Sequence, residues 1–236
     1  MDIWTISLTG LFAGVFGIGL GGIISLVIKK TDFMFSLLLG LTGGFMLFIV
    51  SFHLLPEAFQ TGSTFTVLIG ILIGILIIVS IEKLIENINN NNPYLKTSII
   101  LGLSIAIHNF PEGLALGSSL LIPSNFGKVL TLAILLHNIP EGVSMSIPLS
   151  LSKFSRLKIL FYSMLAGVPM GLGAFAGAAI GSISNQFISL CLAIAGGTML
   201  YIICDEIIPT GKTLHKGRVS SIGIIIGFLL GFILYN

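Results

Sequence analysis

The chain has 236 residues, of which 55% are hydrophobic and 8% are charged, and its mean hydropathy is +1.09. A soluble domain carries about 25% charged residues, so this composition excludes a protein whose whole surface faces water. The net charge of +2 gives no indication of nucleic-acid binding, and we expect a lipid bilayer to be the main surrounding.

Eight apolar runs along the chain are long enough to cross a bilayer as helices of about 20 residues. The predicted spans are residues 3–28, 33–59, 64–82, 97–122, 128–150, 157–183, 187–209 and 217–235. The first run has no basic leader and no clear cleavage site, so we expect it to be retained as a helix. The sequence therefore predicts an all-α integral membrane protein with eight transmembrane helices, in a single transmembrane domain over residues 1–236.

The connections between these spans are short and polar. The longest runs from Glu82 to Lys96, and its segment 89–93 reads Asn-Asn-Asn-Asn-Pro, which is typical of a turn. Basic residues gather in the connections after spans one, three, five and seven, and only Lys128 lies on the other side. The residues so grouped are Lys29, Lys30, Lys83, Lys96, Lys153, Arg156, Lys158, Lys212, Lys216 and Arg218. Because Lys and Arg favour the cytosolic side, this asymmetry predicts a multi-pass protein of the cell membrane with both termini outside.

Glycines spaced by four residues recur in most of the predicted spans. They are Gly10/Gly14, Gly17/Gly21, Gly40/Gly44, Gly70/Gly74, Gly167/Gly171, Gly173/Gly177 and Gly223/Gly227/Gly231. Such spacing lets helix backbones approach closely in lipid. It indicates a compact bundle and does not indicate a function.

Spans four and five carry ionisable residues at a depth where lipid tolerates few of them. Span four contains His108-Asn109-Phe110-Pro111-Glu112-Gly113, and span five contains His137-Asn138-Ile139-Pro140-Glu141-Gly142, the same pattern 29 residues later. A histidine and a glutamate four residues apart share one helix face. Both motifs begin about ten residues into their spans, which puts them near the bilayer centre. An ionisable group there costs at least about 2.5 kcal/mol, so it normally has a partner or a function.

The prolines of the two motifs increase their polarity. Pro111 and Pro140 each remove a helical hydrogen bond and thereby free the carbonyls of Ile107 and Leu136. Since the two spans run antiparallel, the motifs should face each other across a pseudo-two-fold axis, as in transporters built from inverted repeats. Imidazole together with carboxylate suits Zn²⁺, Fe²⁺, Co²⁺, Mn²⁺ or Cd²⁺. The sequence therefore predicts an inverted-repeat bundle with a central metal site between helices four and five. The alternative is a set of His–Glu hydrogen bonds that only holds two helices together.

Four further polar residues lie near the ends of other spans. His53 and Glu57 are four residues apart near the outer end of span two, and Asp205 and Glu206 lie near the inner end of span seven. With the central motifs they form outer, middle and inner stations of a transport pathway. The alternative for these four is that charged groups near helix ends reach the membrane interface. Met46, a turn or two below His53, is by default a packing residue.

The paired motifs resemble those of the ZIP (Zrt/Irt-like protein) metal transporters, and the resemblance extends over the whole chain. It includes eight spans with both ends outside, the segment His53-Leu54-Leu55-Pro56-Glu57, and Asp205-Glu206 followed by Pro209. The connection after span three lacks the His-rich tract common in eukaryotic members. The resemblance therefore implies a compact prokaryotic transporter.

The resemblance also implies a two-metal centre between spans four and five. His108, Glu112, His137 and Glu141 match the ligands of its main site, and Met46 matches a position where methionine completes that site. Asn109 and Asn138 would join the two glutamates at the second site, and His53 would line the outer entrance. Many bacterial members carry a glutamate immediately before the proline of span six, where this chain has Val168. The second site should therefore bind metal weakly or be lost.

A polar cluster of this kind in mid-membrane admits three functions. Transport of divalent cations, most readily Zn²⁺, into the cytosol explains the duplicated cluster in mid-membrane. An intramembrane metal-dependent hydrolase would use a general base beside the metal, but asparagine stands at the position where an HExxH motif has glutamate. A non-transporting metal sensor would need an output domain, which the sequence lacks. We therefore expect a transporter and not an enzyme, with metal ions and lipid as partners, no cofactor and no nucleic acid; a homodimer is left open.

Overall fold

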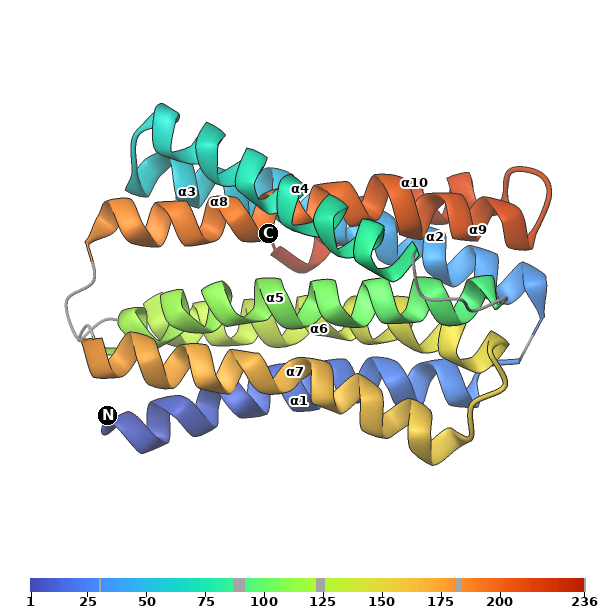
Figure 1. Cartoon of the computed structure of the whole chain (residues 1–236), viewed down its shortest axis with the longest axis horizontal. Coiled ribbons are helices and arrows are strands. Elements are labelled where there is room, and N and C mark those ends of the chain that lie inside the picture. The colour runs from blue at the N-terminus through green and yellow to red at the C-terminus, as the bar shows by residue number, and fades with distance from the viewer. Residues whose placement is uncertain (30, 87–91, 122–125, 181–183, 236) are drawn as a thin grey trace.

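The computed structural model describes residues 1–29, 31–86, 92–121, 126–180 and 184–235, and every long element in those ranges is a helix (Figure 1). The helices are α1 (Ile3–Val27), α2 (Asp32–Ile49), η1 (Val50–Leu54), α3 (Leu55–Thr61), α4 (Thr64–Glu86), α5 (Pro93–Leu121), α6 (Phe126–Leu151), α7 (Arg156–Ile180), α8 (Asn185–Ile202), η2 (Ile203–Ile207), α9 (Ile208–Leu214) and α10 (Val219–Tyr235). The short η segments are π-helical turns. They join α2 to α3 and α8 to α9 without a break, so the described elements form eight rods.

These rods confirm the predicted all-α membrane class. Seven of them are long and apolar enough to cross a bilayer, and the shorter apolar helix Val219–Leu234 follows them. The α10 helix has 17 residues, which is about 25 Å at 1.5 Å per residue and lies at the lower end of the range for a membrane span. Large apolar side chains such as Leu8, Leu72 and Leu157 are more than half exposed, as expected for surfaces that face lipid.

Two boundaries differ from those expected. The connection between spans three and four is shorter than the sequence indicated, because α4 continues to Glu86 and α5 already begins at Pro93. Proline suits the first turn of a helix, and the side chain of Asn92 accepts a hydrogen bond from the Leu95 N–H at 3.3 Å. Span seven continues to Leu214, because Pro209 stands in the first turn of α9, where proline does not interrupt the helix. Asn89 to Asn91, Lys30 and the side chain of Lys128 lie outside the described residues.

The two ends of the chain are copies of one unit with a fixed offset of 153 residues. Helices α1 and α7 both have 25 residues and begin at residues 3 and 156. The rods α2–η1–α3 and α8–η2–α9 both consist of 18, 5 and 7 residues and begin at residues 32 and 185. Helix α1 runs opposite to its copy α7, and α2 runs opposite to its copy α8 (Figure 1). The repeat is therefore inverted.

Glycine contacts follow the same repeat. There is no room for a Cβ atom on Gly44, because the carbonyl of Ile224 on α10 abuts it, and the equivalent Gly197 abuts the carbonyl of Ile71 on α4. Gly14 and Gly167, which are equivalent to each other, pack backbone against backbone where α1 crosses α7. These contacts explain the small residues spaced by four, because only glycine permits such approach between helices.

The helices divide into two bundles (Figure 1). Helices α1, α5, α6 and α7 pack together as bundle A, and α2, α3, α4, α8, α9 and α10 pack together as bundle B. The contacts of the described glycines with other helices all lie within one bundle. Across the boundary, α5 lies against α8 and α2 lies against α6. The motif-bearing helices α5 and α6 thus belong to bundle A and face bundle B.

Candidate metal centre

Helices α5 and α6 carry the two histidine–glutamate motifs and pass through Pro111 and Pro140 as continuous helices. The six polar residues of the motifs are all buried, and none is more than 3% exposed. They are His108, Asn109, Glu112, His137, Asn138 and Glu141. The spacing of four residues brings each histidine and its glutamate to one helix face. The antiparallel arrangement then turns the two faces toward each other.

The imidazoles and carboxylates of the motifs pair across the two helices. Nε2 of His108 lies 2.9 Å from Oε1 of Glu141, and Nε2 of His137 lies 3.1 Å from Oε2 of Glu112. A longer contact of 3.9 Å joins His137 Nε2 to Glu141 Oε1 on the same helix. The four side chains therefore form one connected chain of contacts, with Glu141 reaching both histidines.

The two asparagines are anchored in equivalent ways. Nδ2 of Asn109 donates to the carbonyl of Ala166 on α7 at 3.1 Å, and Nδ2 of Asn138 donates to the carbonyl of Ala13 on α1 at 3.0 Å. Ala13 and Ala166 are 153 residues apart, so the repeat relates these two bonds. With the amide nitrogen engaged, each asparagine keeps its Oδ1 atom for another partner.

Five buried atoms of the motifs have no hydrogen-bond partner within the described part of the chain. They are Glu112 Oε1, Glu141 Oε2, Asn109 Oδ1, Asn138 Oδ1 and His108 Nδ1. When Nε2 of His108 carries the proton shared with Glu141, its Nδ1 atom has a lone pair, so all five are acceptors. Buried acceptors normally have partners. A group of acceptors with two carboxylates in a low-dielectric interior favours a cation.

The three residues singled out on span two, Met46 as a ligand and His53 and Glu57 on the outer pathway, lie in bundle B. Met46 is 2% exposed and belongs to the same apolar cluster as Ile105 of α5 and Val143 of α6. His53 lies in the π-helical turn η1, its ring is tilted against the ring of Phe48 with centroids 5.4 Å apart, and it is within electrostatic range of His137. Glu57 is half-buried in α3 and accepts a long hydrogen bond from Thr61 at 3.5 Å.

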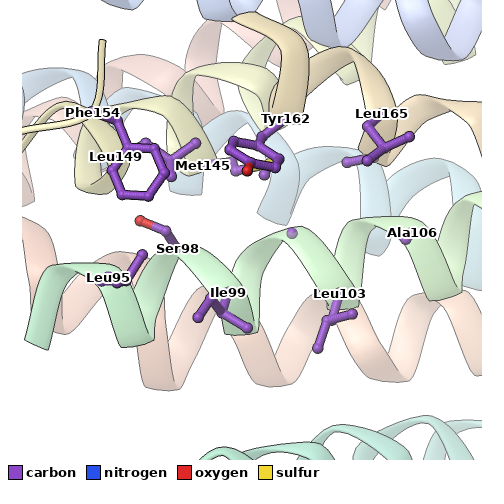
Figure 2. A pocket seen from close by; sticks show the side chains of 12 residues that line it. Leu95, Ser98, Ile99, Leu103, Ala106, Met145, Leu149, Phe154, Tyr162 and Leu165 are labelled. Atoms are coloured by element: carbon purple, nitrogen blue, oxygen red, sulfur yellow. The ribbon is translucent and has the colours of Figure 1, made fainter. Parts of the chain in front are cut away.

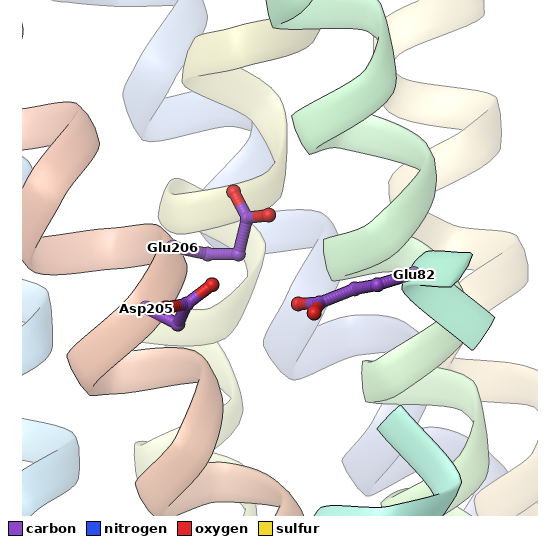
Figure 3. A group of neighbouring side chains, drawn as sticks. All are labelled: Glu82, Asp205 and Glu206. Atoms are coloured by element: carbon purple, nitrogen blue, oxygen red, sulfur yellow. The ribbon is translucent and has the colours of Figure 1, made fainter. Parts of the chain in front are cut away.

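Asp205 and Glu206 join a third carboxylate that the sequence did not indicate. Oxygen atoms of Glu82, Asp205 and Glu206 all lie within 4.8 Å of one another (Figure 3). Glu82 reaches from α4 toward η2, and its Oε2 atom accepts a hydrogen bond from the Tyr201 hydroxyl at 2.7 Å. The sequence suggested that Glu82 lay in or beside an exposed connection. It lies inside the last turns of α4, because α4 packs along α8 through Gly70 and Gly74.

The two π-helical turns stand at equivalent positions of the repeat. Adding 153 to His53 gives Glu206, and adding 153 to Pro56 gives Pro209. Because the repeat is inverted, η1 leads into α3 at one end of the bundle and η2 leads into α9 at the other end (Figure 1). Such turns are frequent at functional sites in helices, and each of the two carries a residue that the sequence predicts on the transport pathway.

Comparisons with known proteins agree with this arrangement. The profile of a family described as ZIP Zinc transporter matches residues 92–235. The chain is 32% identical to Zinc transporter ZupT of Chlorobium phaeovibrioides over 96% of this chain and 95% of that protein. It is 33% identical to the protein of the same name from Campylobacter jejuni, over 97% and 94% of the two chains. A third such transporter, from Corynebacterium glutamicum, is 32% identical over 92% of each chain.

Proposed function

This chain belongs to the ZIP zinc transporter family, and we propose that it moves divalent cations through the paired histidines and glutamates of α5 and α6. It is a multi-pass membrane protein that transports divalent metal, zinc first among them, and it is not an enzyme. We propose further that transport runs into the cytosol and that both termini lie outside. Fe²⁺, Mn²⁺, Co²⁺ and Cd²⁺ should be further substrates, because mixed imidazole and carboxylate sites bind several divalent ions.

The unpartnered acceptors of the two motifs are the observation that carries this proposal. With neutral imidazoles, Glu112 and Glu141 leave two negative charges in mid-membrane, where each costs several kcal/mol. A divalent cation neutralises that pair and accepts the free lone pairs of the same residues. Hydrogen bonds between the helices would by themselves leave those lone pairs unused.

We assign the main site to His108, Glu112, His137 and Glu141, with Met46 as an additional ligand from bundle B. Both histidines already contact a glutamate within 3.1 Å. The ion would therefore replace these hydrogen bonds by metal–ligand bonds of about 2.0–2.2 Å. A thioether from Met46 adds a soft ligand, which favours zinc and cadmium over calcium and magnesium.

We propose that the second site, which Asn109 and Asn138 would form with the glutamates, is weak in this protein. The Asn109 amide is held by the Ala166 carbonyl of α7. Two residues further along α7, the side chain of Val168 is half-buried hydrocarbon and supplies no ligand atom. Removing one carboxylate from a site for a divalent ion removes both a ligand and a compensating charge.

We propose a route that begins at His53 and ends at the carboxylates of Glu82, Asp205 and Glu206. His53 lies in η1, within electrostatic range of His137. At the opposite end, three carboxylates near Lys96 and the other basic residues of the cytosolic side provide oxygen ligands for release. Glu57, at the outer end beyond His53, adds a carboxylate that attracts cations to that end.

Alternating access would follow from a shift of bundle A against bundle B. The four main ligands belong to bundle A, whereas Met46, His53 and the acidic group belong to bundle B. Each bundle is tightly joined inside by glycine contacts. The boundary between them is therefore the natural plane of movement, as in other inverted-repeat transporters. The sequence contains no GxxxxGK[ST] loop for ATP, and the ion gradient or membrane potential would drive transport.

Zinc flux into liposomes that contain the purified protein tests this proposal. We expect the wild type to carry Zn²⁺ and Cd²⁺ down a gradient, and Glu112→Ala and Glu141→Ala to reduce the rate at least about 100-fold, since each removes a charged ligand. Asp32→Asn is the matched control, because Asp32 is an exposed carboxylate in the first turn of α2. Unchanged flux in both glutamate variants would show that the ion takes another route.

A further inference from the structure

A large apolar pocket lies between α5, α6 and α7, apart from the proposed metal route. Its volume is about 510 Å³, within the range of about 300–1,000 Å³ typical of ligand sites. Figure 2 shows α5 along one side of the pocket and residues of α6 and α7 along the other. Ser98 and Tyr162 contribute the hydroxyl groups of its lining, and no charged residue lines it. Such a lining suits a hydrocarbon ligand and does not suit a metal ion.

The pocket opens onto the surface that faces lipid. Leu103, Tyr162 and Leu165 line it and are 44%, 39% and 50% exposed. Along α5 the lining extends from Leu95 to Ala106, about 16 Å at 1.5 Å per residue. Half of a typical hydrocarbon core is about 15 Å thick. The pocket therefore covers the depth that the acyl chain of one lipid leaflet reaches.

Basic residues stand at the end of the pocket that lies toward the membrane surface. Phe154 lines this end and packs edge-on against Tyr162 at 5.9 Å. Lys153 precedes Phe154, and Arg156 and Lys158 follow it, and all three are exposed. An aromatic pair beside a group of basic residues is typical of a membrane interface. Negatively charged headgroups of the same leaflet would meet these cations directly.

We propose that this pocket is a binding site for one anionic phospholipid. One acyl chain would occupy the apolar cavity, and the phosphate would lie against Lys153, Arg156 and Lys158. These three basic residues, the rim of the pocket, select an anionic headgroup. Because the pocket opens toward lipid, its ligand arrives from the bilayer. The deep end includes Ala166, whose carbonyl holds Asn109 of the metal centre. The bound chain therefore supports α7 at the place where it contacts the central site.

Two kinds of variant test the acyl and headgroup parts separately. Gly102→Leu fills the cavity, since a Cβ there meets only the flexible end of Met145, its Cε atom at 2.8 Å. Ala106→Leu fills the deep end and serves as a second test should Gly102→Leu fail to fold. The triple variant Lys153→Asn, Arg156→Gln, Lys158→Gln removes the rim charges, and asparagine tolerates the positive φ of residue 153. The control Lys212→Gln, Lys216→Gln, Arg218→Gln removes the same charge from another connection.

Native mass spectrometry of delipidated protein, with added dioleoyl phosphatidylglycerol or dioleoyl phosphatidylcholine, measures the binding. We expect one phosphatidylglycerol per chain, held more tightly than phosphatidylcholine with the same acyl chains. Each basic side chain near anionic lipid contributes roughly fivefold in affinity, so the triple variant should weaken binding roughly 100-fold. Its control should bind like the wild type, and a folded cavity-filling variant should bind neither lipid specifically.

Equal phosphatidylglycerol affinity in the triple variant and its control, or undiminished binding in the filled variants, would overturn the proposal. The readout is independent of metal transport, so either idea can fail alone.

Discussion

Replacing Glu141 by glutamine is the substitution from which the structure predicts the largest loss of zinc affinity. Glu141 is fully buried, lies 2.9 Å from the Nε2 atom of His108, and lies 3.9 Å from that of His137. Glutamine keeps the size and one acceptor oxygen but removes the negative charge. Changes in groups that only support a metal ligand already reduce affinity about 10–100-fold. Loss of a charged ligand should therefore reduce it at least about 100-fold.

Thermal unfolding with and without zinc measures this loss. At a zinc concentration 100 times the wild-type Kd, binding stabilises the wild type by about 2.7 kcal/mol. For a chain of this length that raises Tm by about 5–10 °C. At the same zinc concentration, a 100-fold weaker Glu141→Gln variant gains about 0.4 kcal/mol, or about 1 °C. A chelator should remove the shift in both proteins.

Asp32→Asn controls for the loss of a carboxylate as such, and it should show the full zinc-dependent shift. Glu112→Gln should lose somewhat less zinc affinity than Glu141→Gln, because Glu112 contacts only one of the two histidines. A zinc-dependent rise in Tm of Glu141→Gln equal to that of the wild type would refute the ligand assignment.

Three further substitutions test separate parts of the account. Val168→Glu should restore a carboxylate to the second site and raise the tightly bound zinc from about one ion per chain to about two by elemental analysis; an unchanged count contradicts the weak second site. Gly197→Ala should lower the free energy of unfolding by about 1–3 kcal/mol through overpacking, because the carbonyl of Ile71 occupies the place of its Cβ. Gly19→Ala meets only the side chain of Met164 and should be tolerated, so equal Tm values for the two variants would contradict this packing. Glu206→Gln should slow zinc flux while leaving the zinc-dependent Tm shift intact, since it acts at release, and a lost shift would instead assign it to the central site.

Most of what could be predicted from the sequence came from patterns within a single helix or two neighbouring helices. Continuous apolar runs predicted the membrane helices because lipid demands them. The repeated motif around His108 and His137 predicted their juxtaposition, because spacing by four and antiparallel neighbours leave little freedom. In each case the signal lies within one helix or within two adjacent helices.

Those patterns do not predict contacts between segments that are distant in the sequence. Glu82 meets Asp205 only because α4 packs on α8, more than 100 residues away. The offset of 153 residues could have indicated this pairing, since Gly70 and Gly74 correspond to Gly223 and Gly227. The repeat is also visible in the sequence, because segments 36–49 and 189–202 are identical at eight of 14 positions.

Zinc K-edge X-ray absorption of tag-free, zinc-loaded protein tests the central claim most directly. The chain has four histidines, so the double variant His53→Ala, His215→Ala leaves only His108 and His137 as imidazoles. The account predicts that this variant still shows multiple scattering from two imidazoles, with nitrogen and oxygen ligands at about 2.0–2.2 Å. A spectrum without imidazole scattering in this folded variant would contradict binding of the cation between α5 and α6.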